Sequence, residues 1–316
     1  MIKRKAIIFG LKSTSISKEE KSLLKTCKPW GIIIFSRNIS GLYQLKNLTK
    51  EIRSIFNDSN YPILIDEEGG RVSRVNKIIN FKTFSQEFLG QKYKNNKKAF
   101  HINYKNYIHL VSSILLEGGI NINTSPVLDV KNKISDKIIG TRAFSKNPKI
   151  ISDIAKLCIK FYNKNKIGTV IKHIPGHGRS NTDSHFFTPR IKASKKQLIK
   201  KDFKCFKKSK SFFAMTGHLI FNSYDKINTS THSKLIIENV IRKHMGFKGI
   251  LISDDISMKA LKYNLETNAT KALEAGCNIV LHCNGKLNEM KRLAKVIPDI
   301  DKFTQKKTSD FYNFLR

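Results

Sequence analysis

Two adjacent aspartates, Asp254 and Asp255, follow the short apolar run Ile250–Ile252. A carboxylate at the end of such a run can attack an electrophilic carbon. On the anomeric carbon of a sugar, this attack forms the covalent intermediate of a retaining glycosidase. Either aspartate can instead cap the helix that follows, by accepting backbone N–H bonds. The spacing favours Asp254 as the nucleophile and Asp255 as the cap, and both interpretations stay open on the sequence alone.

A second group of reactive side chains lies in the loop that holds His173, His177, Asp183 and His185. His173 and His177 have the i, i+4 spacing of a helical zinc motif, but Pro175-Gly176 between them prevents a regular helix. The general-base glutamate of such motifs is also missing from the sequence, so we expect no metal. Asp183 and His185 form an Asp-x-His pair, in which the carboxylate can fix the tautomer of the imidazole and raise its basicity. A solvated surface histidine is the alternative.

Short apolar runs that alternate with longer helical patterns indicate a parallel sheet covered by helices. The expected strands are Ala6–Phe9, Gly31–Phe35, Ile63–Ile65, Ile120–Asn123, Thr169–Ile171, Phe213–Met215, Ile250–Ile252 and Ile279–Leu281. The expected helices are Ser17–Cys27, Leu42–Phe56, Phe100–Leu116, Pro148–Asn163, Ser194–Phe206, Ser233–His244, Leu265–Ala275, Leu287–Val296 and Asp301–Phe314. Eight such repeats predict an α/β fold, a single (β/α)8 TIM-type barrel that occupies residues 1–316 as one domain.

In a barrel of this kind, catalytic side chains lie just beyond the carboxyl ends of the strands. Six expected strands end in polar residues, at 36–38, 66–71, 172–173, 216–218, 253–255 and 282–284. Together they predict a pocket for a polar ligand. The G-x-G-x-x-G fingerprint of a dinucleotide fold does not follow the first strand, and we expect no cofactor.

Composition narrows the class of protein. The 316 residues are 40% hydrophobic and 26% charged, as in folded proteins, and no apolar run is long enough to span a membrane. The net charge of +35 predicts nonspecific attraction of acidic partners, but the lysines are spread along the chain and no nucleic-acid motif accompanies them. Five scattered cysteines without CxxC pairing favour a reducing compartment, so we expect a cytoplasmic protein without specific nucleic-acid partners.

Four segments resemble the glycoside hydrolase family 3 β-N-acetylglucosaminidases of bacterial cell-wall recycling. They are residues 66–74 (DEEGGRVSR), 139–145 (IGTRAFS), 172–178 (KHIPGHG) with 183–185 (DSH), and 253–258 (SDDISM). Weaker similarity covers Gly31–Asn38, Pro126–Val130 and Gly276–Asn278. The segments appear in family order and cover nearly the whole barrel.

The resemblance implies roles for individual residues. Asp254 would be the nucleophile, and His185, supported by Asp183, would be the general acid/base in place of the usual carboxylic acid. The residues that would bind the terminal N-acetylglucosamine are Asp66, Arg74, Arg142, Lys172 and His173. The implied substrate is N-acetylglucosamine β-1,4-linked to anhydro-N-acetylmuramic acid, with or without its peptide, and we expect a monomer.

The sequence departs from the family pattern at two positions. Glu67 replaces the usual glutamine, and an extra carboxylate beside Asp66 could alter its pKa; Thr141 stands where the family often has an acidic residue. Three alternatives remain: a phosphorylase of the same fold, a β-glucosidase of the same family, and a basic polyanion-binding protein with a decayed enzyme site. The short chain and the Asp-Ser-His loop argue against the β-glucosidase.

Overall fold

The computed structural model describes residues 3–132, 139–180, 184 and 187–316. Within these residues, eight parallel strands form a closed barrel in the order β1-β10-β9-β7-β5-β4-β3-β2. The strands are β1 (Lys5–Gly10), β2 (Pro29–Ile34), β3 (Ile63–Ile65), β4 (Ile122–Asn123), β5 (Gly168–Ile174), β7 (Phe213–Thr216), β9 (Ile250–Asp255) and β10 (Ile279–His282). The predicted TIM-type barrel is confirmed, and every predicted strand is present.

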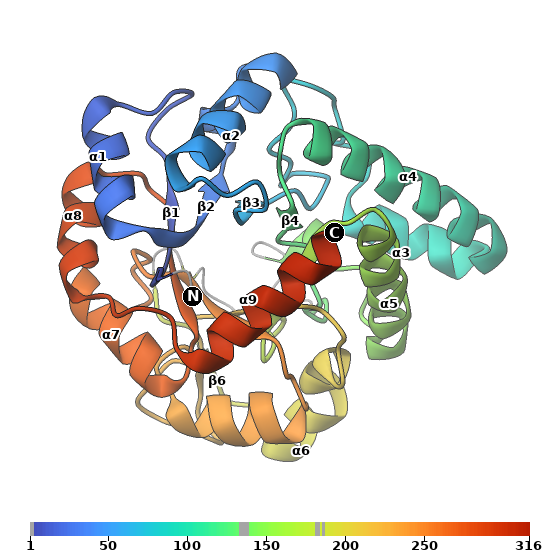
Figure 1. The fold of residues 1–316 in the computed structure, drawn as a ribbon. Helices are drawn as coiled ribbons and strands as arrows, with labels where there is room; N and C mark the ends of the chain where they lie inside the picture. The colour runs from blue at the N-terminus through green and yellow to red at the C-terminus, as the bar shows by residue number, and fades with distance from the viewer. Residues whose placement is uncertain (1–2, 133–138, 181–183, 185–186) are drawn as a thin grey trace.

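Helices surround the barrel on the outside (Figure 1). They are α1 (Lys18–Cys27), α2 (Leu42–Phe56), α3 (Gln86–Asn95), α4 (Lys97–Glu117), α5 (Pro148–Lys164), α6 (Lys195–Gln197), α7 (Leu265–Ala275), α8 (Leu287–Val296) and α9 (Lys302–Leu315). The capping box predicted at Ser17 and Glu20 is present at the start of α1. Across the described residues, every helix is too short or too polar to cross a lipid bilayer.

Two predicted helices are wound differently from the expectation. The segment Ser194–Phe206 is not one helix: α6 continues into a π-helical turn, η4 (Leu198–Asp202), and a 3-10 turn, η5 (Phe203–Phe206). The change of winding coincides with Asp202, whose buried carboxylate accepts a hydrogen bond from Arg179 Nε at 2.7 Å. The predicted helix at Ser233–His244 is a π-helix, η6, at Ile236–His244.

One α-helix and two β-strands have no counterpart in the prediction. Helix α3 lacks a strong apolar face, and Gly90 within it allows close packing, since a Cβ there would lie 1.7 Å from the carbonyl oxygen of Phe144. Strands β6 (Arg190–Ile191) and β8 (Ile220–Phe221) form a separate parallel pair. Two residues are too few to give a periodic pattern in the sequence.

The amino end of the barrel is covered by helix α9, which crosses in front of the strands in Figure 1. Phe311 of α9 is fully buried and packs against Phe213 at the start of β7, with ring centroids 5.1 Å apart. The indole N–H of Trp30 in β2 donates to Thr308 Oγ1 of α9 at 2.8 Å. This end is therefore filled by side chains, and the carboxyl end is left for the functional site.

Candidate active site

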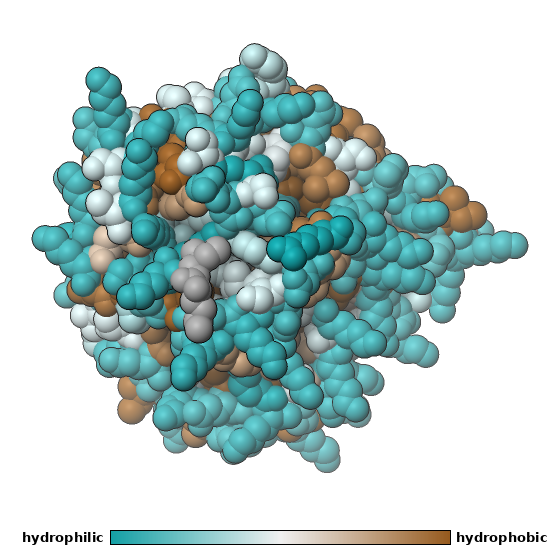
Figure 2. All heavy atoms as spheres, in the orientation of Figure 1, coloured by the Kyte–Doolittle hydropathy of each residue, from teal (hydrophilic) through white to brown (hydrophobic). Residues whose placement is uncertain are grey.

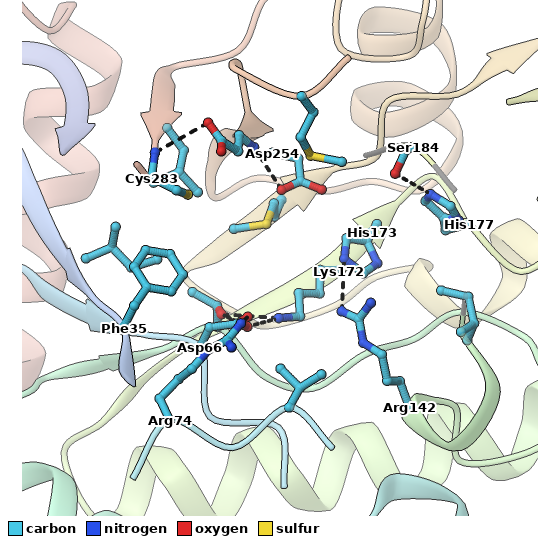
Figure 3. A pocket seen from close by; sticks show the side chains of 18 residues that line it. Phe35, Asp66, Arg74, Arg142, Lys172, His173, His177, Ser184, Asp254 and Cys283 are labelled. Atoms are coloured by element: carbon cyan, nitrogen blue, oxygen red, sulfur yellow. Dashed lines mark hydrogen bonds and ion pairs between the residues drawn. The ribbon is translucent and has the colours of Figure 1, made fainter. Parts of the chain in front are cut away.

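A cavity of about 250 Å³ lies at the carboxyl ends of the strands. It is smaller than the pockets that hold drug-sized ligands and suits a single sugar ring. Six of the eight predicted site residues line it: Asp66, Arg74, Arg142, Lys172, His173 and Asp254 (Figure 3). The structure therefore brings together side chains from four loops and strand ends that are far apart in the sequence.

Asp66, just after β3, is held in its ionised form by three neighbours. Its Oδ1 pairs with the ammonium of Lys172 and accepts from Thr124 Oγ1 at 2.7 Å, and its Oδ2 accepts from Arg74 Nη2 at 2.8 Å. Burial opposes ionisation, but the charges of Lys172 and Arg74 outweigh it and lower the pKa of Asp66. The result is a fixed acceptor beside two cationic donors, the combination that suits pairs of sugar hydroxyls.

Glu68 is a second buried carboxylate of the site, to which the sequence analysis assigned no role. It accepts two hydrogen bonds from Arg142, each 2.7 Å long, and pairs with Lys172 Nζ at 2.6 Å. Burial opposes ionisation of Glu68, but Arg142 and Lys172 lower its pKa. The bidentate pair fixes the plane of the Arg142 guanidinium at the cavity wall.

Asp129 is another residue that the sequence analysis left without a role. It lies in the Pro126–Val130 segment after β4, is fully buried, and its Oδ2 lies 2.7 Å from His173 Nδ1. Its carboxylate also accepts from the backbone N–H of His177 at 2.6 Å. An ionised carboxylate only accepts, so Nδ1 of His173 carries a proton. A guanidinium only donates, so Nε2 of His173, 3.4 Å from Arg142 Nη2, is an acceptor. The rule that functional residues follow strand ends could have identified Asp129.

Bulges at two strand ends explain why neighbouring residues share the cavity. In a regular strand, successive side chains point to opposite faces. The register of β5 against β7 shifts between Lys172 and Ile174, and the register of β9 against β10 shifts between Ile252 and Asp255. Both Lys172 and His173, and both Asp254 and Asp255, consequently line the cavity.

Asp254 lies across the cavity from Asp66 and Arg74 in Figure 3. Its Oδ1 accepts from the backbone N–H of Asp255 at 2.8 Å. Burial would raise the pKa of Asp254, but His173 and His218 in their protonated forms, this hydrogen bond and the ammonium of Lys172 lower it overall. Asp254 is therefore an anion that faces the cavity, as nucleophilic attack requires.

The interpretation of Asp255 as a helix cap is wrong. Asp255 Oδ1 accepts from the backbone N–H groups of Ser257, at 3.1 Å, and Cys283, at 3.3 Å. It thus closes a turn and ties β9 to the end of β10. The following helix, α7, begins ten residues later and is capped by Asn264.

Asp183 and His185 lie outside the described residues. Ser184 between them is described, lines the cavity, and its Oγ is 3.3 Å from Nε2 of the buried His177. Among the described residues, no group of three or more histidine, cysteine or acidic side chains could hold a metal ion. The metal-free site remains a prediction.

Glu67 does not act on Asp66 as the sequence suggested. Its carboxylate turns into the loop and accepts backbone N–H bonds from Gly69, Arg74 and Val75 and the hydroxyl of Ser73. Burial raises the pKa of Glu67 to about 7, although these hydrogen bonds pull it down. Glu67 therefore closes the loop that presents Arg74. Thr141 is exposed, outside the cavity.

Comparison with known proteins places this geometry in a family. Residues 2–310 match the model of the glycosyl hydrolase family 3 N-terminal domain. A β-hexosaminidase of Alkalilimnicola ehrlichii is 32% identical over 285 residues, which cover 88% of this chain and 80% of that protein. A β-hexosaminidase of Shewanella frigidimarina is 32% identical over 284 residues, covering 88% of this chain and 82% of that protein.

A solved structure agrees. NagZ from Neisseria gonorrhoeae, in complex with N-trifluoroacetyl-D-glucosamine, superposes with a TM-score of 0.88 at 27% identity and covers all of this chain and 90% of that one. The sequence relatives and the structural neighbour therefore indicate the same family. The chain belongs to glycosyl hydrolase family 3 and is a glycoside hydrolase of the β-N-acetylhexosaminidase type.

Proposed function

We propose that this enzyme is a retaining exo-β-N-acetylglucosaminidase that removes terminal N-acetylglucosamine from muropeptides through a covalent glycosyl ester on Asp254. The observation that carries the proposal is the ionised carboxylate of Asp254, which faces the Asp66–Lys172–Arg74 cluster across a cavity the size of one sugar. In this arrangement the carboxylate of Asp254 attacks the anomeric carbon from one side, and the cluster on the opposite side binds the sugar ring.

Binding rests on five side chains. The carboxylate of Asp66 accepts from sugar hydroxyls, and Arg74 and Arg142 donate to sugar oxygens from the N–H groups that Asp66 and Glu68 leave free. Lys172 directs its three N–H bonds to Asp66, Glu68 and Thr124 and so holds the Asp66 carboxylate in position for the sugar. His173 offers Nε2 as an acceptor, because Asp129 fixes its proton on Nδ1. All of these groups are held by ion pairs or hydrogen bonds within the protein, so their positions are preorganised for the sugar.

The reaction has two steps. Asp254 attacks the anomeric carbon as the glycosidic bond breaks, and His185 donates a proton to the departing oxygen. His185 then takes a proton from water, which attacks the anomeric carbon and releases the sugar from Asp254. Asp183 orients His185 in both steps. Support for the dyad comes from the sequence motif, and Ser184 between the two residues lines the same cavity.

The substrate proposal rests on the relatives and on charge. NagZ from Neisseria gonorrhoeae binds N-trifluoroacetyl-D-glucosamine, an N-acyl glucosamine like the proposed terminal sugar. The net charge of +35 suits an anionic aglycone such as anhydro-N-acetylmuramic acid with its peptide. Five free cysteines agree with a cytoplasmic role in cell-wall recycling, for which a monomer without nucleic-acid partners is proposed.

The test compares the two adjacent aspartates. Asp254→Ala is expected to abolish hydrolysis of a chromogenic β-N-acetylglucosaminide, because the nucleophile is gone. Asp255→Ala is the matched control and should keep much of the activity, since Asp255 holds a turn. A covalent glycosyl fluoride inactivator should label Asp254 when the inactivated protein is digested and sequenced by mass spectrometry. Labelling of Asp255, or sugar 1-phosphate as the main product in phosphate buffer, would contradict the proposal.

A further inference from the structure

A histidine outside the predicted site contacts the backbone of the residue that follows the proposed nucleophile. His218 follows β7 by two residues and is fully buried. Its Nε2 lies 3.0 Å from the backbone carbonyl oxygen of Asp255 in the neighbouring strand β9. Its Nδ1 lies 2.7 Å from Thr231 Oγ1.

These contacts fix the protonation of the ring. A carbonyl oxygen can only accept, so Nε2 carries the hydrogen that the carbonyl of Asp255 receives. The Nδ1 atom of the neutral ring is then an acceptor, and Thr231 donates its hydroxyl hydrogen to it. Thr216 Oγ1, 2.8 Å from Thr231 Oγ1, can supply a hydrogen to Thr231 in turn. Burial lowers the pKa of His218, which favours the neutral ring.

The carbonyl that His218 holds belongs to the bulge of β9. Between Ile252 and Asp255, β9 has one residue more than the facing part of β10, and this extra residue turns Asp254 and Asp255 together into the cavity. The peptide group after Asp255 is held on both sides: its oxygen accepts from His218, and its N–H, that of Ile256, donates to the carbonyl of Leu281 at 2.9 Å. A bulge leaves an irregular ladder, so its shape depends on such outside contacts.

We infer that His218 is a positioning residue that locks the β9 bulge and thereby sets the direction from which the Asp254 carboxylate approaches the anomeric carbon. Thr231 acts through His218 by fixing its tautomer. The inference rests on the proposed role of Asp254. His218 and Thr231 form a second group of residues at the site. This group touches neither the sugar nor the reacting atoms.

His218→Phe keeps the ring volume but removes the donor to Asp255, whereas His218→Gln keeps an amide donor without the ring. Because a small misplacement of a reacting group can cost about 100-fold in rate, His218→Phe should slow covalent inactivation by the glycosyl fluoride between about tenfold and 100-fold. The dissociation constant of N-acetylglucosamine should stay unchanged, since Asp66, Lys172 and Arg74 are untouched. His218→Gln should recover most of the inactivation rate.

His232→Phe is the matched control. His232 Nε2 also lies close to a backbone carbonyl oxygen, that of Asn268 in α7 at 3.0 Å, outside β9. Its removal should lower the melting temperature as His218→Phe does, without slowing inactivation. If His218→Phe does not fold, Thr231→Val gives the same comparison, because it removes the donor to Nδ1 and leaves the imidazole in place.

The outcomes separate the two proposals. If Asp254→Ala stays active, the proposed nucleophile is wrong. If Asp254→Ala is inactive but His218→Phe is inactivated as fast as the wild type, only the positioning role fails. Equal slowing in His218→Phe and His232→Phe, or no recovery in His218→Gln, also overturns it.

Discussion

The charged groups of the site form one connected network of ion pairs. Two carboxylates, Asp66 and Glu68, meet three cations, Arg74, Arg142 and Lys172, in a group of ion pairs that is largely buried. Removing one partner of such a group leaves an uncompensated buried charge. This lowers the stability of the folded state far more than the loss of a surface ion pair does. Binding of a neutral sugar therefore leaves the charges in place and uses only their free hydrogen-bonding positions.

Glu67 gives the enzyme a measurable dependence of stability on pH. Its pKa is raised to about 7 in the folded state, so the folded state binds the proton more tightly than the unfolded state does. The stability from this group is present below about pH 4.5 and is lost as pH rises to about 7. Relative to Glu67→Gln, the free energy of unfolding of the wild type should fall by about 3 kcal/mol across this range.

Urea unfolding at a series of pH values measures this difference. Glu117→Gln is the control, because Glu117 is exposed at the end of α4 and should leave the wild-type slope unchanged. If the free energy of unfolding depends on pH in the same way in the wild type and in Glu67→Gln, Glu67 ionises alike in the folded and unfolded states, which would contradict the prediction.

The dyad makes its own prediction for reaction rates. General acid–base catalysis contributes about 10²–10⁴-fold, so His185→Ala should slow substrates with poor leaving groups by about that factor. Phenols of low pKa need little protonation as they leave. The glycosylation step of their glycosides should therefore be slowed less by His185→Ala. Azide, a nucleophile that needs no base, should partly restore turnover and yield a glycosyl azide. Asp183→Ala should show a milder loss.

Rates are measured against leaving-group pKa in both variants. Equal slowing of good and poor leaving groups, without rescue by azide, would make His185 a binding residue.

At the scale of elements, the sequence predicts the barrel well and the strand ends poorly. All eight strands follow from short apolar runs, but β5 and β9 continue to Ile174 and Asp255, beyond the apolar residues that mark them. Ladder hydrogen bonds continue through polar residues, and the bulges there leave no periodic signal. The contacts of Glu68 and Asp129 join residues dozens of positions apart, so they exist only once the barrel closes.

A substitution in helix α9 tests how much its packing stabilises the closed end of the barrel. Phe311→Ala should lower the free energy of unfolding by about 3–5 kcal/mol, because it empties a fully buried site beside Phe213 and Gly168. KM and kcat at low temperature should not change, since the cavity lies at the other end. Phe303→Ala, on the same helix but 40% exposed, is the control and should cost much less. Chemical denaturation and steady-state kinetics of the three proteins measure both effects. A change in KM in Phe311→Ala would show coupling between the two ends.

At the scale of the whole molecule, charge dominates the surface. Several of the 24 acidic residues are buried, among them Glu20, Glu67, Glu68, Asp129 and Asp202, so the exposed surface is more basic than the net charge of +35 alone suggests. Figure 2 shows hydrophilic side chains over most of the face that carries α9, with scattered apolar ones between them. A field of this sign raises the local concentration of anions.

Salt should therefore separate charged from neutral substrates. Between about 0.05 and 0.5 M NaCl, KM for a substrate with a carboxylate-bearing aglycone should rise by about tenfold, because screening shortens the reach of the field. KM for a neutral chromogenic β-N-acetylglucosaminide should change little and is the internal control. Equal salt dependence for both substrates would show that the positive surface takes no part in substrate capture.

The position of Trp30 has a practical consequence. It is the one tryptophan of the sequence, fully buried at the closed end of the barrel, with its N–H on Thr308 of α9. Its fluorescence therefore reports on the closed end of the barrel, where the indole ring also lies against Phe213. Emission should be blue-shifted while α9 is docked and should shift to longer wavelength when α9 leaves, even if the rest of the barrel stays folded. A sugar that enters the opposite end should leave the spectrum unchanged, so unfolding can be followed optically while the active site is occupied.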